Sequence, residues 1–114
     1  MKATELRTLL ANVLADRNVH FGDNTGSFGD NNYKINYQIK NTTLLEYERT
    51  FIIDFDIWCK DEVEVDELAD TIESLFNYKT YDSATFYLEN RYNADEKEVY
   101  RRTLTYEVRT FNEN

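Results

Sequence analysis

The stretch from Arg49 to Asn77, RTFIIDFDIWCKDEVEVDELADTIESLFN, changes its hydrophobic period halfway along. Its first half alternates, with Phe51, Ile53, Phe55, Ile57 and Cys59 on one face and Ile52, Asp54, Asp56, Trp58 and Lys60 on the other. A period of two is expected of a half-buried strand. The second half places apolar residues at helical spacing, at Val65, Leu68, Ala69, Ile72, Leu75 and Phe76. The stretch therefore predicts a strand and a helix that share one core.

The rest of the chain adds further segments with a regular period. A helical stripe is formed by Leu6, Leu9, Leu10, Val13 and Leu14. Alternation predicts strands at residues 33–40, 84–92 and 100–109, and the polar turn NADEKE joins the last two strands into a hairpin. The predicted fold class is α+β with the element order α-β-β-α-β-β. We expect an antiparallel sheet of about four strands with two helices packed on one face.

The predicted strands are long for a chain of this size. The central and final strands could each extend to roughly 40 Å, whereas a compact domain of 114 residues has a mean diameter of about 30 to 35 Å. We therefore predict that one or more β-hairpins project beyond the core. No linker or repeat divides the sequence, so residues 1–114 are expected to form a single domain.

Charge and cysteine content exclude several classes of protein. The formal net charge is −9, and nucleic-acid affinity comes mainly from Lys and Arg that neutralise phosphates, so direct DNA binding is not expected. Cys59 is the only cysteine and belongs to the apolar row, so no intramolecular disulfide can form. No apolar run approaches the roughly 20 residues that cross a bilayer. We expect a protein made in the cytoplasm that has no membrane partner.

Two connections carry more aromatic and aliphatic side chains than a surface loop needs. Residues 21–32 contain all three glycines in a run of Asn, Asp and Ser, which predicts a flexible connector. Its Phe28 is an apolar side chain through which the connector could become ordered on contact with a partner. The connection before the central strand contains Leu44, Leu45 and Tyr47. Large apolar groups at such a place either fold back onto the core or meet another chain. The sequence leaves both outcomes open.

The sequence offers little catalytic chemistry. Its single histidine and three serines are too few, and too isolated, to suggest a triad or a zinc site. Asp54 and Asp56 are the best enzymatic candidates, because two carboxylates on one face of a strand suit some divalent-metal sites. The alternative is that this face forms cross-strand ion pairs with Arg101, Arg102 or Arg109, in the same chain or a neighbouring one. We favour ion pairs, and predict no catalytic residue, metal or cofactor.

Trp58 is predicted to project from the same face as Asp54 and Asp56, opposite the apolar row. A tryptophan on a polar face needs a cover. Another helix could supply it, but tryptophan and tyrosine with arginine nearby are also the usual anchors of protein interfaces. For Trp58 we favour an interface with another chain.

Several segments of the sequence resemble the tail-completion proteins of long-tailed bacteriophages, also called tail terminators or tail-to-head joining proteins. These segments are a leucine-rich N-terminal helix, a strand ending in DIWCK, the helix VDELADTIESLF, the strand ATFYLENRY and the closing strand YRRTLTYEVRTF. The resemblance covers Thr4 to Phe111 and rests on element order and strand endings, with no catalytic signature. The chain departs from the family pattern before the first strand, where a Gly/Asn-rich loop replaces a proline-containing segment.

What the resemblance implies is a structural virion protein of the tail neck that assembles as a ring, expected to be a hexamer. The ring would cap the tail tube, end tail elongation and form the tail side of the head-tail joint. Its partners would be copies of itself, the tail-tube protein and the head connector, with DNA only passing through the channel. As a hypothesis, we assign to its interfaces Trp58, Asp54, Asp56, Leu44, Leu45, Tyr47, Phe28, Arg101 and Arg109.

Two other classes of function stay open at this point. A small acidic inhibitor that imitates DNA would display carboxylates at phosphate-like spacing and would bind a basic enzyme as a monomer. A metal-dependent enzyme would use Asp54 and Asp56 as ligands. Competition with DNA for a nuclease would identify the first, and heat released on titration with magnesium or manganese would identify the second.

Overall fold

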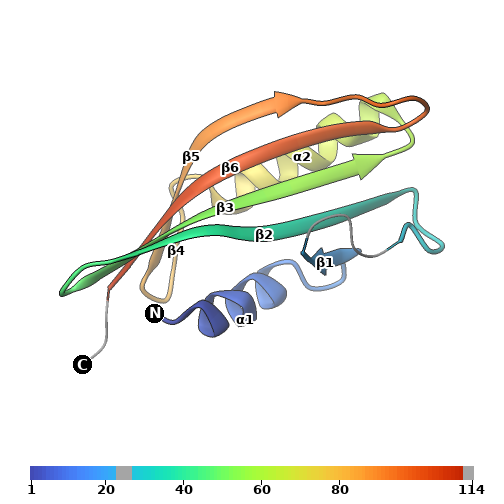
Figure 1. Cartoon of the computed structure of the whole chain (residues 1–114). Helices are drawn as coiled ribbons and strands as arrows, with labels where there is room; N and C mark the ends of the chain where they lie inside the picture. The colour runs from blue at the N-terminus through green and yellow to red at the C-terminus, as the bar shows by residue number, and fades with distance from the viewer. Residues whose placement is uncertain (23–26, 112–114) are drawn as a thin grey trace.

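The chain forms a curled, mixed β-sheet with two helices in a computed structural model that describes residues 1–22 and 27–111 (Figure 1). The helices are α1 (Ala3–Val13) and α2 (Glu62–Phe76). The strands are β1 (Val19–Phe21), β2 (Tyr33–Leu44), β3 (Glu48–Cys59), β4 (Thr80–Tyr81), β5 (Ala84–Asn93) and β6 (Tyr100–Phe111). In space they follow the order β1-β2-β3-β6-β5-β4. None of the helices in this part of the chain is long and apolar enough to cross a membrane.

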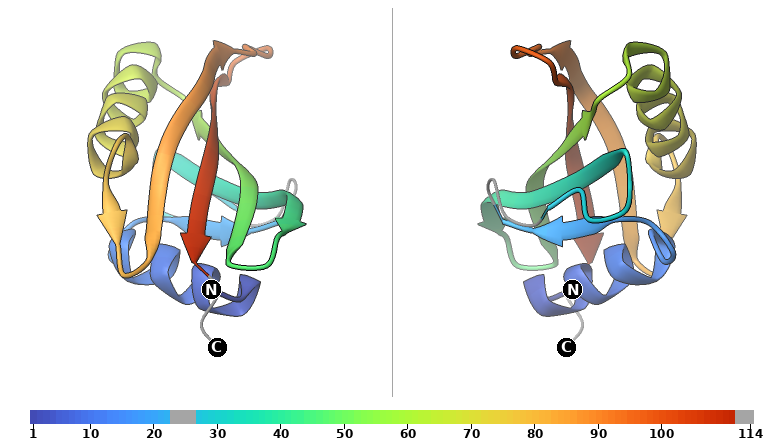
Figure 2. Two further views of the ribbon diagram at one scale, coloured as in Figure 1. Left: turned by 90° about the vertical axis from the view of Figure 1, so that its left-hand side faces the viewer. Right: turned by 90° about the vertical axis from the view of Figure 1, so that its right-hand side faces the viewer.

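The predicted four-stranded antiparallel sheet, with its order α-β-β-α-β-β, is wrong. The sheet has six strands and is mixed, because β1 pairs parallel with β2, and it curls into a half-barrel (Figure 2). The added strands, β1 and β4, have only three and two residues. Strands this short cannot show a hydrophobic period, and β1 ends inside the segment that the sequence analysis assigned to a connector.

The strand and helix predicted between Arg49 and Asn77 are confirmed as β3 and α2. Asp61 caps the helix, because its Oδ2 accepts a hydrogen bond from the backbone N–H of Glu64 at 2.8 Å. Both helices lie on the inner side of the curl and cover the apolar row of the sheet (Figure 2). The largest fully buried side chains of this core are Tyr106, Phe51, Phe55, Phe76, Phe86, Leu6, Leu10 and Leu14.

The molecule is elongated, with principal extents of 48 × 24 × 21 Å. Its long axis follows β2 and β3, which form a hairpin that reaches the left-hand end of the molecule in Figure 1. The other face of the sheet, which we call the outer face, carries polar side chains and Trp58. The fold therefore presents a polar outer face and a narrow hairpin end.

Replacing Tyr106 by phenylalanine is expected to stabilise the protein. The Tyr106 hydroxyl is buried in the core without a hydrogen-bond partner in the described part of the chain, and burial raises its pKa. An unsatisfied buried hydroxyl costs about 1 to 3 kcal/mol, so Tyr106→Phe should raise the free energy of unfolding by about 1 kcal/mol in urea denaturation. A lower free energy of unfolding would mean that a bound water satisfies the hydroxyl.

Candidate functional site

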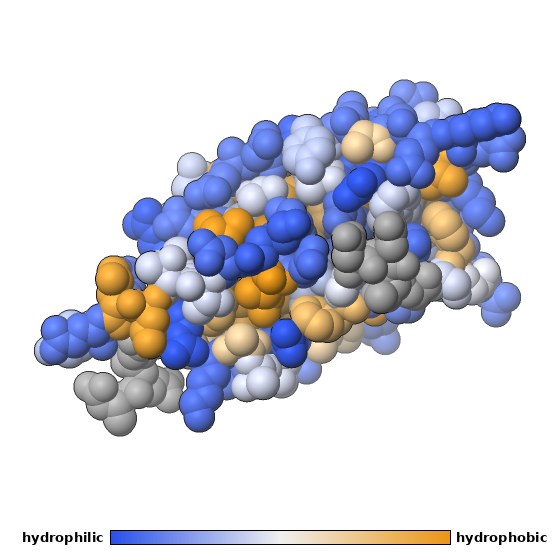
Figure 3. Space-filling view, viewed as in Figure 1, coloured by the Kyte–Doolittle hydropathy of each residue, from blue (hydrophilic) through white to orange (hydrophobic). Residues whose placement is uncertain are grey.

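Four large apolar side chains are exposed together at the hairpin end of the molecule. Leu44 is 60% exposed, Leu45 58%, Tyr47 64% and Phe111 65%. Phe111 reaches this end because it is the register partner of Glu48, the first residue of β3. The register puts Phe111 and Leu45 on the outer face and Leu44 on the inner face, around the same end of the hairpin. Hydrophobic surface is visible at this end in Figure 3, and we call these four residues the apolar tip. Large apolar groups that gather on a surface are typical of a contact site for another molecule.

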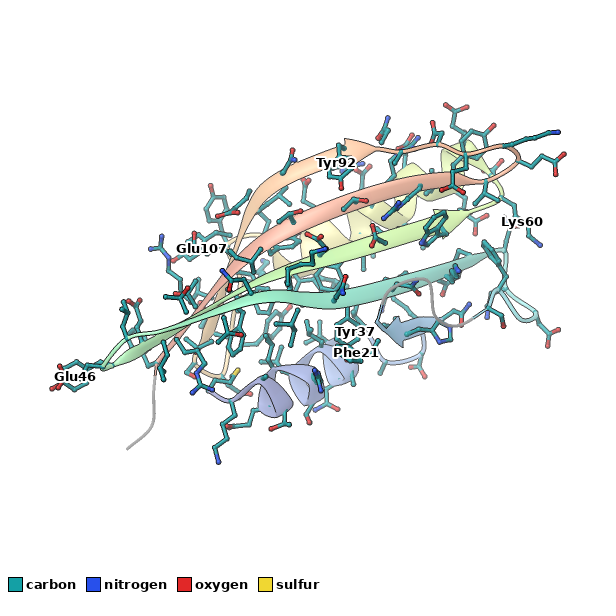
Figure 4. The ribbon with its side chains drawn as sticks, viewed as in Figure 1. Phe21, Tyr37, Glu46, Lys60, Tyr92 and Glu107 are labelled. Carbon is teal, nitrogen blue, oxygen red and sulfur yellow. The ribbon has the colours of Figure 1, made fainter. Side chains whose placement is uncertain are left out.

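The local sequence explains why these side chains stay at the surface. The backbone N–H of Leu45 donates to the carbonyl oxygen of Glu48 at 2.8 Å, which closes a tight turn around Glu46 and Tyr47. Figure 4 shows Glu46 at the extreme end of the hairpin, away from both helices. Of the two outcomes left open by the sequence, folding back onto the core is therefore excluded for Leu44, Leu45 and Tyr47.

Trp58 is on the outer face, as predicted, but it is only 8% exposed. Two cations flank its ring: the Lys34 Nζ lies 5.3 Å and the Arg101 Cζ 4.7 Å from the ring centroid. These cation–π contacts use side chains from the neighbouring strands β2 and β6. The chain itself thus supplies the cover that the sequence analysis attributed to a partner. Trp58 exposes too little surface to act as an interface anchor in this conformation.

Asp54 and Asp56 are held by neighbouring strands. The Asp56 Oδ1 accepts hydrogen bonds from Arg101 Nη2 at 2.8 Å and from Thr103 Oγ1 at 2.7 Å. The Asp54 Oδ1 accepts one from Thr105 Oγ1 at 2.7 Å. The predicted cross-strand ion pair is therefore present between Asp56 and Arg101. Within residues 1–22 and 27–111, no group of three or more His, Cys, Asp or Glu is placed to hold a metal ion.

The other two arginines named as partners of Asp54 and Asp56 bind other acids. Arg109 is exposed, pairs with Glu107 at 3.0 Å on its own strand, and stacks over Tyr87. Arg102 is on the inner face, only 2% exposed, because consecutive residues of a strand point to opposite sides. Its guanidinium binds Asp66 of α2 and Asp95 of the β5–β6 turn. This ionic cluster around a buried arginine was missed from the sequence.

Phe28 contacts cations in the described part of the connector at residues 21–32. The Lys60 Nζ lies 5.1 Å and the Lys34 Nζ 5.8 Å from its ring centroid, and its side chain is half-buried. Residues 23–26 of this connector lie outside the described part of the chain. The surface assigned to Phe28 is therefore at the end of the molecule that holds Trp58, away from the apolar tip.

Two acids, Glu89 and Glu107, lie close to each other on the outer face of the sheet, at the bulge in β5. The Glu89 side chain is exposed, but loss of some hydration, a hydrogen bond with Glu107 and the charge of Glu107 together raise its pKa. An acid with a raised pKa in the folded state binds its proton more tightly when folded. The stability that this proton provides is complete below the ordinary pKa of the acid and is lost as pH rises through the raised pKa.

Glu89→Gln is therefore expected to be more stable than the wild type at about pH 7, and the difference should vanish below about pH 4. Urea denaturation at a series of pH values measures it. Asp82→Asn, an exposed acid in the β4–β5 turn, is the matched control and should show no such convergence. A Glu89→Gln difference that stays constant with pH would contradict the interaction with Glu107.

Comparison with known proteins does not assign this site to a family. No protein-family model matches the sequence, and no curated protein is significantly similar to it. The apolar tip is the feature that an isolated chain would not need.

Proposed function

We propose that the chain is a structural protein of the bacteriophage tail, which assembles as a ring, caps the tail tube and forms the tail side of the head-tail joint. The observation that carries this proposal is the apolar tip, whose four side chains are each more than half exposed. A cyclic ring needs two different patches on each subunit, and further faces for the tube and the head. The tip supports one such patch, and the resemblance of the segments DIWCK and YRRTLTYEVRTF to tail-completion proteins supports the kind of assembly, although the order of elements differs from the one expected.

The outer face supports a structural role more than a catalytic one. Its best candidates for metal ligands, Asp54 and Asp56, accept hydrogen bonds from Thr105, Thr103 and Arg101. These bonds use the carboxylates to hold strands together. They also keep the two acids from lying free at phosphate-like positions, as a DNA-mimicking inhibitor would need. The ring is therefore our choice among the three classes.

The mass of the assembled protein tests the proposal. We expect native mass spectrometry of the protein at high concentration to show a closed oligomer, and electron microscopy to show rings. Added to its cognate tail-tube protein during polymerisation, the protein should bind one end of each tube and shorten the tubes. A monomer that leaves tube length unchanged would overturn the proposal, and competition with DNA for a nuclease would replace it with the inhibitor.

A further inference from the structure

Both edges of the sheet are only partly covered. At one edge, β1 pairs with Ile35 to Tyr37 of β2; at the other, β4 pairs with Ala84 and Thr85 of β5. Next to β4, the backbone of Tyr78 and Lys79 also bonds that of Phe86. Beyond these contacts, no strand in the described part of the chain pairs with β2 or β5 on these outer sides. The two open segments lie at opposite ends of the sheet, since β1 and β4 cover opposite ends of it.

Hydrogen bonds accepted by two side-chain amide oxygens identify the backbone groups that face outward. The Thr42 N–H donates to Asn41 Oδ1 at 2.9 Å, and the Leu88 N–H donates to Asn77 Oδ1 at 3.1 Å. These donors point away from β3 and β6, and the direction alternates along an antiparallel strand. Backbone groups of Leu44 on β2 therefore also point outward. The bulge in β5 shifts the alternation by one residue, so that beyond Leu88 the backbone groups of Arg91 and Asn93 point outward.

We propose that the open edge of β2 in one copy pairs antiparallel with the open edge of β5 in the next copy, which joins neighbouring sheets into one. The inference rests on the proposed ring and names the contact that closes it. In the sheet, β2 runs antiparallel to β3, β3 to β6 and β6 to β5, so β5 runs opposite to β2. Two copies in the same orientation, as in a ring, thus present edges with matching antiparallel direction.

The side chains of the two edges are compatible with this pairing. Natural edge strands usually discourage contact with charged residues, above all lysine. Beyond its bulge, however, the open segment of β2 is Asn41 to Leu44, which has no charge and contains two threonines that favour strands. The segment beyond the bulge of β5, Asn90 to Asn93, presents the exposed Asn90 and Tyr92 on the outer face.

The pairing requires neighbouring copies to be offset along the strand direction. In one sheet, Thr43 is level with Thr50 and Arg109, whereas Asn90 is level with Thr105. Positions 109 and 105 of β6 differ by four residues, which corresponds to roughly 13 Å. Strands that lean relative to the ring axis absorb such an offset, as the shear of a closed barrel does. Upright strands would instead give an open helical filament.

Cysteine cross-linking tests the edge contact directly. In the proposed pairing, Thr43 of one copy lies opposite Asn90 of the next, with both exposed side chains on the outer face and at disulfide distance. We expect a mixture of Thr43→Cys and Asn90→Cys proteins to give several-fold more covalent dimer under mild oxidation than either variant alone. The wild type is the control, because its single Cys59 is buried and burial raises its pKa.

Each outcome of this experiment separates the edge contact from the ring. Preferential cross-linking of the mixture supports the edge contact. Dimers of Thr43→Cys alone would show that two β2 edges pair about a twofold axis, which overturns the contact between β2 and β5. If rings form but Thr43→Cys cross-links neither to Asn90→Cys nor to Tyr92→Cys, the edge contact is overturned and the proposed function still stands. A wild-type protein that forms no oligomer would overturn both.

Discussion

Replacing both leucines of the apolar tip by glutamine is expected to weaken self-association or tail-tube binding by roughly a hundredfold. Leu44 and Leu45 are each more than half exposed, so in the proposed interface another chain buries them. Complete burial of a leucine contributes about 1.5 to 3 kcal/mol. Loss of about 3 kcal/mol for the pair corresponds to a roughly hundredfold increase in the dissociation constant. Analytical ultracentrifugation and tube-binding assays measure the change, and circular dichroism confirms that the variant is folded.

Val63→Gln is the matched control for the tip variant. Val63 is also apolar and is 66% exposed, but it lies in the first turn of α2, away from the hairpin end. We expect it to associate like the wild type. Equal losses in Val63→Gln and in the tip variant would show that general surface hydrophobicity drives association. Unchanged association in the tip variant would remove the tip from the interface.

The sequence predicted the centre of the fold well and its edges poorly. The alternation before Cys59 and the helical spacing after Val65 each span enough residues to define a period, and both elements are present. The strands β1 and β4 are fixed by tertiary contacts, such as the pairing of Val19 with Ile35, which no local pattern records. The sheet was therefore predicted with too few strands and with the wrong connectivity.

In the candidate site, too, the residues marked by local sequence were found, whereas those placed by strand register were missed. The sequence marked Leu44, Leu45 and Tyr47 as unusually apolar for a connection but left open whether they fold back onto the core, and the structure exposes all three. Phe111 was missed because only the register of β6 against β3 brings it to the tip. Trp58 was placed on the correct face, but the register that sets Lys34 and Arg101 on either side of it could not be read from the sequence.

Removing both carboxylates that bind Arg102 is expected to destabilise the fold strongly. Arg102 Nε donates to Asp66 at 2.7 Å and its Nη1 to Asp95 at 2.6 Å, while the arginine is only 2% exposed. Burial disfavours the charge of Arg102, but these hydrogen bonds outweigh burial, so its pKa is raised. Without them a buried charge is left unpaired, and Asp66→Ala with Asp95→Ala should lower the free energy of unfolding by about 3 kcal/mol in urea denaturation.

Arg102→Met should lower the free energy of unfolding far less, by about 1 kcal/mol, because methionine removes the buried charge and fills much of the same volume. The two carboxylates left behind are half-exposed, so water can hydrate them. Asp70→Ala is the matched control on α2, since Asp66 also lies 4.0 Å from Arg91, and Asp70 binds Arg91 at 2.7 Å. Its exposed pair should contribute under about 1 kcal/mol. If Arg102→Met were as destabilising as the double alanine variant, the packing of this side chain between α2 and β6 would outweigh its charge.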